Sequence, residues 1–492
     1  MTFRPTTLSR RRVIAGLGAS ATLIVLPPSV AVAQPAGDDG FRVLRAKAGT
    51  AHLRGPAARP TRIWGYDGLS PGPILRVKQG EELKVRLVNE LDQTTAIHWH
   101  GLRIDNAMDG VPHLTQRPVA PGESFDYRFT PPDAGTFWYH THFLSSEQLE
   151  RGLYGALIVD ETTPVNVDRD MTLVLDDWRL TANGDIDPSF GNMHDAMMEG
   201  RLGQYATINS QDEFEIKLRT NERMRLRLIN AANARIFRLR ITDHETRVMA
   251  VDGQPCPPEV IADGWLRLGP GARTDLFLDA TLKSGATARI VIDNGRGGEF
   301  ALGTLAYDNS APLREAPLPA PDALPANPLP TQIDLKSALT IDIPLDGGMG
   351  MMMGGGMMGG MGGGMGGGMR GAMGPGRFNG FGLPSQERLW ALASISSSGH
   401  DGPPLFRVAR GRTVMLDFVN RSLMPHAMHV HGHHFRQISN GGMTPYWLDT
   451  VIVDPERSER VAFVADNPGK WMLHCHMIEH MATGMAAWFE VT

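Results

Sequence analysis

Cysteine is scarce in this sequence, with only Cys256 and Cys475 among 492 residues. A small fold held together by several disulfides is therefore excluded. A strong excess of one charge is missing too, because 48 lysines and arginines stand against 53 aspartates and glutamates, for a formal net charge of −5. This balance gives no indication of nucleic-acid binding, so we expect no nucleic-acid partner. The length suits about three domains of ordinary size.

A long uninterrupted apolar run is also missing. The Ala/Gly-rich stretch from Val13 to Leu26 is short for a membrane span, and two prolines follow it. Ser9-Arg10-Arg11-Arg12 precedes the stretch, and Ala31-Val32-Ala33 supplies a small-residue cleavage site. We predict that residues 1–33 are a twin-arginine signal peptide, which directs folded, cofactor-loaded protein to the periplasm or out of the cell. Ordinary secretion and a membrane anchor are the alternatives, and we expect no stable membrane insertion.

Histidine, in contrast, is concentrated in a repeated pattern. Eight of the 17 histidines form four His-x-His pairs: His98-Trp99-His100, His140-Thr141-His142, His429-Val430-His431 and His474-Cys475-His476. Side chains at i and i+2 of a β-strand point to the same face, so each pair directs two imidazoles to one place. One pair alone is typical of a polar strand face, but four pairs, one of them enclosing a cysteine, predict several clustered metal ions. Imidazole and thiolate together favour copper.

The chain repeats one strand pattern three times. Residues 80–89, 221–230 and 411–420 each alternate apolar and polar side chains and end in asparagine. A second strand pattern recurs at the positions 121–129, 270–278 and 455–463. Period-2 alternation, short strands and many Gly/Pro turns predict an all-β chain of three Greek-key barrels or sandwiches. We place the three domains at residues 40–162, 168–325 and 330–492.

The histidine pairs follow this repeat. The ninth residue after the closing asparagine is His98 in the first copy and His429 in the third, whereas it is Leu239 in the second. Residues 135–142 also match residues 469–476 position for position. The first and third domains therefore supply equivalent pairs, which we expect to converge in the cleft between them. The second domain supplies no ligand, and we expect it to act as a spacer.

A further set of ligands occurs in the third copy alone. His426 precedes the pair that begins at His429, and His480 and Met485 follow Cys475. A thiolate, two imidazoles and a weak axial thioether are the ligand set of a blue-copper electron-transfer centre. The sequence therefore predicts a second kind of copper site in the third domain.

The chain resembles the multicopper oxidases over essentially all of the length that follows the signal peptide. The motifs His-Trp-His-Gly, Trp-Tyr-His-Thr-His, His-x-x-His-x-His and His-Cys-His-x-x-x-His-x-x-x-x-Met all occur in the order of that family. The resemblance implies three cupredoxin-like domains and four copper ions per chain. It implies these ligands: His426, Cys475, His480 and Met485 for the type 1 copper, His98 and His429 for the type 2 copper, His100, His140 and His476 for one type 3 copper, and His142, His431 and His474 for the other.

The same resemblance suggests roles for neighbouring residues. Asp109 matches the family's acidic residue beside the trinuclear centre and is expected to relay protons, with a plain turn role as the alternative. Cys475 is expected to carry electrons between the two kinds of site, since it is bonded to a type 3 ligand on either side. Apart from the resemblance, Asp449 is expected to orient a ligand imidazole or to serve its loop. His433 and His434 are expected to face solvent or to support ligands, and Cys256 to be a structural or merely tolerated thiol.

Residues 347–376 form a low-complexity segment of glycine and methionine, which we expect to be a flexible insertion in the third domain. Thioether sulfur selects Cu(I), and the segment resembles the methionine-rich insertion of bacterial periplasmic cuprous oxidases. Ser422 and Met481 stand where those enzymes carry an aspartate and a glutamate. A tolerated surface loop is the alternative. The expected Cu(I)-binding residues are Met349, Met351, Met352, Met353, Met357, Met358, Met361, Met365, Met369, Met373 and Met424.

These patterns predict an exported enzyme that oxidises Cu(I) to Cu(II), in copper detoxification, while it reduces dioxygen to water. The alternative is a laccase-type oxidase of phenols and aromatic amines, which would share every copper ligand. A copper store would need no electron path, and a copper nitrite reductase would not need four His-x-His pairs. The expected partners are dioxygen and either Cu(I) or a small organic reductant, and we expect a monomer.

Overall fold

The computed structural model describes residues 37, 39–293, 295, 297–348, 389–392, 402–439 and 442–492. Strands account for most of the regular structure there, and the helices are one turn long, which confirms the all-β prediction. The predicted signal peptide at residues 1–33 and the ten methionines from Met349 to Met373 lie outside the described residues. No helix in the described ranges is long and apolar enough to span a membrane.

The first β-domain consists of two four-stranded sheets. Its elements are β1 (Arg42–Ala51), β2 (Thr61–Tyr66), β4 (Leu83–Asn89) and β6 (Ser124–Phe129) in one sheet, β3 (Gly72–Lys78), β5 (His98–His100), β7 (Gly135–His140) and β8 (Tyr154–Asp160) in the other, with η1 (Asn106–Met108) and α1 (Ser145–Gln148) in the loops.

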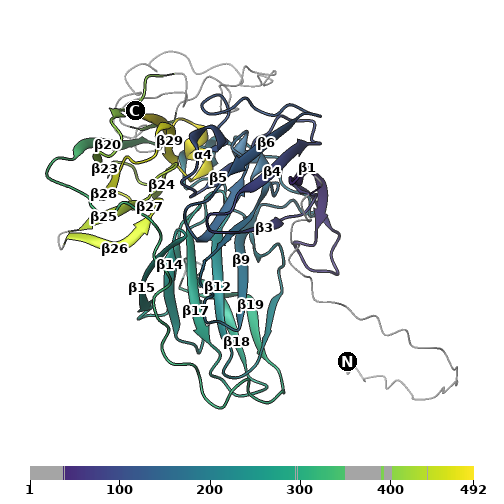
Figure 1. The fold of residues 1–492 in the computed structure, drawn as a ribbon. Helices are drawn as coiled ribbons and strands as arrows, with labels where there is room; N and C mark the ends of the chain where they lie inside the picture. The colour runs from purple at the N-terminus through teal and green to yellow at the C-terminus, as the bar shows by residue number, and fades with distance from the viewer. Residues whose placement is uncertain are drawn as a thin grey trace, which may run out of the picture. The chain divides into compact units, whose positions relative to one another are not determined.

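The second β-domain consists of a six-stranded and a five-stranded sheet. Its elements are β9 (Arg169–Trp178), β10 (Tyr205–Ile208), β12 (Arg223–Asn230), β14 (Thr246–Val251), β15 (Gln254–Val260) and β17 (Arg273–Asp279) in the first sheet, β11 (Phe214–Leu218), β13 (Phe237–Ile241), β16 (Leu266–Leu268), β18 (Thr287–Asp293) and β19 (Glu299–Tyr307) in the second, and the short helix α2 (Met193–Met197). The strands β9, β12, β17 and β14 run side by side in Figure 1.

The third β-domain has the same two sheet sizes as the second. Its elements are β20 (Leu339–Gly347), β21 (Trp390–Leu392), β23 (Thr413–Asn420), β25 (Phe435–Ser439), β26 (Gly442–Leu448) and β28 (Ser458–Val464) in one sheet, β22 (Arg407–Val408), β24 (His426–Val430), β27 (Thr450–Val453), β29 (Gly469–Cys475) and β30 (Ala486–Val491) in the other, and the helix α4 (Ile478–Ala482).

The same three-strand unit recurs in each β-domain. The repeated strands β4, β12 and β23 pair antiparallel with β6, β17 and β28. On their other side they pair parallel with β1, β9 and β20. In β4 the burial alternates along the strand, so Leu83, Val85 and Leu87 point into the core, as the period-2 pattern predicts.

Each β-domain has its own apolar core, and a further cluster joins all three. Trp138 of the first domain, Trp178 of the second and Met472 of the third belong to this shared cluster and are fully buried. Burial of such large side chains is the main favourable contribution to domain packing. The shared cluster therefore holds the histidine-bearing strands of the first and third domains in a fixed relation.

The strand register places the histidine pairs equivalently in the first and third domains. His98 is paired with His140 across β5 and β7, and His429 is paired with His474 across β24 and β29. Trp99 between the first two imidazoles packs into the domain core. The two imidazoles of the pair therefore occupy the opposite face of the strand.

The second domain differs in register from what residue counting indicates. Counting makes Leu239 and Ile241 the counterparts of a histidine pair, but both pack into the domain core from β13. The residues on the other face of this strand are Arg238 and Arg240. The arginines, not the leucine and isoleucine, thus occupy the face that carries imidazoles in the other two domains.

Candidate metal centres

Eight imidazoles from the first and third domains gather into one buried cluster. Within this cluster, three groups of three histidines each bring one ring nitrogen per residue within 4.8 Å of the others. The first group is His100, His140 and His476, the second is His142, His431 and His474, and the third is His98, His100 and His429. The first two groups contain the residues expected at the two type 3 positions, and the third contains both residues expected at the type 2 position.

The ring nitrogens of this cluster are arranged as metal donors. His98 and His140 use Nδ1 to donate to backbone carbonyls of Asp109 and Thr141 at 2.7 and 2.8 Å, and their Nε2 atoms are buried without a partner. A buried polar atom without a partner costs about 1–3 kcal/mol. A hydrogen bond at one nitrogen that fixes the other as a lone-pair donor is typical of metal-ligating histidines. These residues therefore fit bound metal ions.

The rings of His431 and His474 also fit a bound metal ion between them. His431 donates through Nδ1 to Asp109 Oδ2 at 2.9 Å, and His474 donates through Nδ1 to the Cys475 carbonyl at 2.9 Å. Their Nε2 atoms, both left with lone pairs, face each other at 3.1 Å. Two lone pairs at this separation repel, and a cation between them would turn the repulsion into two bonds.

Burial keeps these imidazoles neutral. It lowers the pKa of His140, His142 and His474 well below the usual value, and neighbouring imidazoles lower it further. Only the neutral ring offers a lone pair to a metal, so the environment selects the form that binds.

A second group of donors lies in the third domain. Cys475 Sγ is 3.7 Å from His426 Nδ1 and 3.8 Å from His480 Nδ1, and the two Nδ1 atoms are 3.1 Å apart. Met485 is fully buried, and its backbone bonds to both Cys475 and His480. Burial raises the pKa of the Cys475 thiol to about 12, so a bound cation is what would favour the thiolate. This group contains the residues expected at the type 1 site.

The Nε2 atoms of His426 and His480 both have partners inside the protein. His480 Nε2 donates to the backbone carbonyl of Met198 in the second domain at 2.6 Å, and His426 Nε2 contacts Ser422 Oγ at 2.9 Å. Trp390 packs against both rings, with centroid distances of 4.3 Å to His480 and 4.9 Å to His426. Met424 is half-buried beside this group.

The acidic residues expected near the histidines do contact them. Asp109 contacts His98 and His431, which links the first and third domains. Asp449 is fully buried, with Oδ1 3.3 Å from His100 Nε2 and 3.4 Å from His429 Nδ1. Asp449 thus contacts two imidazoles of the cluster, as the expectation that it orients a ligand imidazole requires.

The expectation that His433 and His434 face solvent is wrong. Both are buried. The His433 ring lies against Phe463, Trp471 and Phe489. His433 Nδ1 contacts the His431 carbonyl at 3.1 Å, and His434 Nε2 contacts the Asp252 carbonyl at 3.1 Å. A supporting role for ligands, the other expectation, stays a prediction. Cys256 is a buried free thiol.

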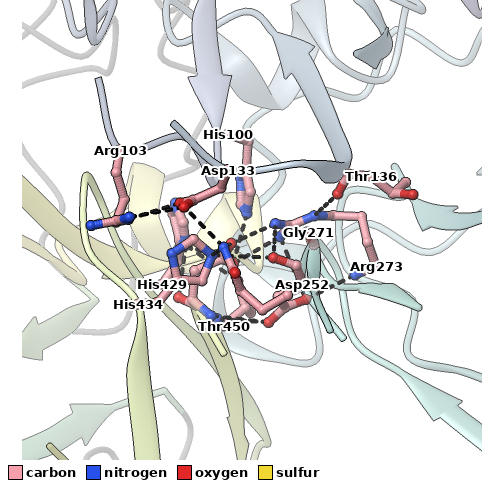
Figure 2. Close-up of polar contacts among 12 residues, drawn as sticks. His100, Arg103, Asp133, Thr136, Asp252, Gly271, Arg273, His429, His434 and Thr450 are labelled. Carbon is pink, nitrogen blue, oxygen red and sulfur yellow. Dashed lines mark hydrogen bonds and ion pairs between the residues drawn. The ribbon is translucent and has the colours of Figure 1, made fainter. Parts of the chain in front are cut away.

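The sequence did not predict that residues of the second domain contact the histidine cluster. Arg273, Asp252 and Gln254 of that domain lie with His100, His429 and His434 in one polar cluster, most of which is labelled in Figure 2. Ion pairs between residues more than 170 positions apart leave no period or spacing in a sequence, so no local signal could have revealed them.

The chain is similar to known proteins along its length. Models of the multicopper oxidase family match residues 48–164, 169–305 and 383–492. The crystal structure of a multicopper oxidase from Pseudomonas thermotolerans is 33% identical, with a TM-score of 0.77, and the match covers 92% of this chain and 99% of that one. Laccase-4 of Trametes villosa is 29% identical over 86% of this chain and 85% of that protein. A copper resistance protein A homolog of Pseudomonas syringae pv. tomato is 26% identical over 98% of both.

Three β-domains with a buried imidazole cluster next to a group of two imidazoles, a thiol and a thioether are typical of multidomain redox metalloproteins. The chain belongs to the multicopper oxidase family, and its β-domains are cupredoxin-like. It is therefore an oxidoreductase whose family uses copper, and the donor set of imidazole, thiolate and thioether fits that metal.

Proposed function

We propose that this protein is a cuprous oxidase, which oxidises Cu(I) to the less toxic Cu(II) and reduces dioxygen to water. Four copper ions per chain would be held by the residues assigned from the sequence, with His426, Cys475, His480 and Met485 around one ion and the eight paired histidines around three. The grouping of the histidine and cysteine donor atoms within 4.8 Å supports this assignment, as do the burial of Met485 and its backbone bonds to Cys475 and His480. Bound there, copper supplies one-electron oxidation of the reductant and four-electron reduction of dioxygen.

The residues of the chain link the two sites and supply protons. Cys475 is bonded through the backbone to His474 and His476, which gives an electron a short covalent route from one site to the other. Asp109 is buried and accepts a hydrogen bond from His431, so its carboxylate can hold a proton next to the imidazole cluster. Reduction of dioxygen to water consumes protons, and an acid at this position would deliver them.

The cover over His480 is the observation that favours Cu(I) over phenols. Its Nε2 atom already donates to Met198, and the ring is fully buried under α2 and Trp390. A bulky phenol therefore has no free imidazole edge to contact. Met198, whose backbone carbonyl binds His480, and Met424, which packs against the third-domain core, are both partly buried, and thioether side chains suit a soft cation.

The experiment compares steady-state rates with Cu(I) and with a phenol in three proteins: the natural chain, a deletion of residues 349–376, and a full-length variant with the ten methionines of that segment changed to leucine. The deletion spares Gly347 at the end of β20, which pairs with Trp390. We expect the deletion and the leucine variant to lose rate at low Cu(I) concentration alike, since both lose the sulfur atoms. Only the deletion should gain phenol activity, because the leucine variant keeps the length of the segment, which we propose partly screens the type 1 site. Copper content should not change, because no assigned ligand lies in the segment, and loop shortening costs little.

A laccase-type activity is the second candidate, supported by the match to a protein named laccase-4. Unchanged Cu(I) kinetics in both variants, together with good phenol oxidation by the natural chain, would replace the cuprous proposal by this one.

We also propose that residues 1–33 direct twin-arginine export to the periplasm or the exterior, that the domains span residues 40–162, 168–325 and 330–492, and that the protein is a monomer. Changing Arg10, Arg11 and Arg12 together to lysine should keep the precursor in the cytoplasm, since the guanidinium pair is read rather than the charge. Normal delivery of the lysine variant, measured by cell fractionation, would assign the signal to ordinary secretion.

A further inference from the structure

A buried arginine of the second domain, Arg273, lies beside the imidazole cluster, although this domain supplies none of the assigned ligands. Arg273 begins β17, and its side chain has no solvent exposure. Its two terminal nitrogens donate to the two carboxylate oxygens of Asp449, at 2.8 and 2.5 Å. Parallel bonds of this kind fix both the position and the plane of a carboxylate.

Asp449 in turn contacts two imidazoles of the cluster. Its Oδ1 atom lies 3.3 Å from His100 Nε2 and 3.4 Å from His429 Nδ1, and it also accepts a hydrogen bond from Thr450 Oγ1 at 2.8 Å. His100 therefore turns its unpartnered Nδ1 atom, not Nε2, into the cluster. His429 Nδ1 also donates to the Asp449 backbone carbonyl at 2.9 Å. The orientation of both rings therefore depends on where Asp449 is held, through its carboxylate for His100 and through both its backbone and its carboxylate for His429.

A second acidic residue, Asp252, holds the backbones of both Arg273 and Asp449. Asp252, between β14 and β15, accepts the backbone N–H of Arg273 at 2.9 Å and those of Asp449 and Thr450 at 3.1 and 3.2 Å. Its backbone carbonyl also accepts from Arg273 Nη2 at 2.9 Å. The guanidinium is thus anchored by its own domain while it reaches the third one, as the labelled side chains in Figure 2 show.

Two glycines leave the space that this arrangement needs. A Cβ atom at Gly101, directly after His100, would collide with Arg273 and would lie 2.6 Å from Asp449 Oδ2. A Cβ atom at Gly271 would lie 2.8 Å from the ring of His476 and 3.0 Å from the ring of His100. Both glycines also have positive φ, of +86° and +83°, which suits glycine. Glycine at these two positions therefore allows Arg273, Asp449 and the imidazoles to approach the backbone closely.

We infer that Arg273 is a positioning residue for the type 2 copper position: it holds Asp449 where that residue orients His429, a type 2 ligand, and its neighbour His100, which is assigned to a type 3 ion. Removal of the guanidinium leaves Asp252 and Asp449 buried without a cation, and a buried charge that has lost its partner rearranges its neighbours or takes up a proton. This inference rests on the proposed ligand assignment. It makes the second domain a part of the copper site and not a spacer alone.

The test uses copper-loaded full-length protein and four variants: Arg273→Gln, Arg273→Lys, Asp449→Asn and the control Arg225→Gln. Arg225 is an equally buried arginine of the second domain, bonded to Asp275 at 2.6 Å and to Glu161 at 2.7 Å, and it contacts no assigned ligand. The measurements are copper per chain, the electron paramagnetic resonance signals of the type 1 and type 2 ions, and the midpoint of thermal unfolding.

We expect Arg273→Gln and Asp449→Asn to weaken copper binding at the type 2 position about 10- to 100-fold, with an altered or missing type 2 signal and an intact type 1 signal. Arg273→Lys should recover part of the signal, since it restores the charge without the paired bonds. Arg225→Gln should lower the unfolding midpoint but leave both signals unchanged. Combining Arg273→Gln with Asp449→Asn should add little to either change alone, because both act through one contact.

A type 2 signal and copper content in Arg273→Gln equal to those of the Arg225→Gln control would overturn the inference. If Arg273→Gln does not fold, the lysine variant and Asp449→Asn carry the same comparison. Absence of a type 2 signal in the natural protein would instead overturn the ligand assignment, so the two failures are distinguishable.

Discussion

The third and second domains share one strand repeat, yet their corresponding strands face different surroundings. On β24, Met428 and Val430 pack into the core, whereas His429 lies on the opposite face and His431 directly follows the strand. On β13, the core face is again apolar, but the other face carries Arg238 and Arg240.

The arginines of β13 have partners of their own. Arg238 lies over the ring of Trp265 at 4.6 Å and pairs with Asp293 at 2.7 Å, so this face serves surface ion pairs. The comparison teaches that a repeated strand becomes a metal-binding strand only through its outward face. The second domain acts on the site from elsewhere, through Arg273 on β17.

The largest expected effect comes from Cys475→Ser in the third domain. Serine lacks the thiolate, so the blue thiolate-to-copper absorption and turnover should both be abolished. The three ions among the eight imidazoles should stay bound, because none of those donors changes. Absorption spectra and copper analysis check this, and a serine variant that remains blue would refute the assignment of Cys475.

A smaller loss is expected for Asp109→Asn, at the contact between the first and third domains. The amide can still bond to His431 but cannot hold the proton, so turnover should fall about 10²-fold or more. Stopped-flow reduction of the blue site without oxygen should keep its rate, since that step does not involve Asp109. Equal turnover of the natural protein and of Asp109→Asn would contradict the proton-relay role and favour the plain turn role of Asp109.

Glu479→Gln addresses how the second domain is attached. Glu479 on α4 accepts hydrogen bonds from Ser146 of the first domain at 2.7 Å and from Asn233 and the Arg201 backbone of the second at 3.2 and 2.9 Å. A neutral amide cannot accept all three, so we expect a loss of about 1–3 kcal/mol of stability, measured by denaturant unfolding. The neighbouring Glu147→Gln, which removes a half-exposed pair with Arg151, should cost under about 1 kcal/mol. Equal losses in both would contradict the attachment role.

The smallest effect is expected from adding a histidine pair to the second domain. The double variant Arg238→His and Arg240→His recreates the His-x-His pattern on β13, but no second pair faces it among the described residues. Copper content per chain should therefore not rise. An additional tightly bound ion, detected by copper analysis after dialysis, would show that the pattern alone makes a site.

Local patterns in the sequence were sufficient to predict the strands, the repeat and the histidine groups. Alternation along residues 83–89 and the i, i+2 spacing of each pair are properties of neighbouring residues, and the structure shows both. The contacts of Arg273 with Asp449 and of His480 with the Met198 carbonyl join distant segments, and one of them uses only a backbone atom. Residue counting did not predict the register of β13, because the turn before it is one residue longer. The closing asparagine binds the carbonyl four residues on in the first and third domains (Asn89, Asn420) but five residues on in the second (Asn230), which reverses the two faces of the strand.

Anomalous diffraction at the copper absorption edge, from crystals of the copper-loaded protein, tests the central claim most directly. We predict four strong peaks per chain, one between Cys475, His426 and His480 and three among the eight imidazoles of the paired histidines, with none on β13. Fewer than three peaks among the imidazoles, or no peak beside Cys475, would contradict the account.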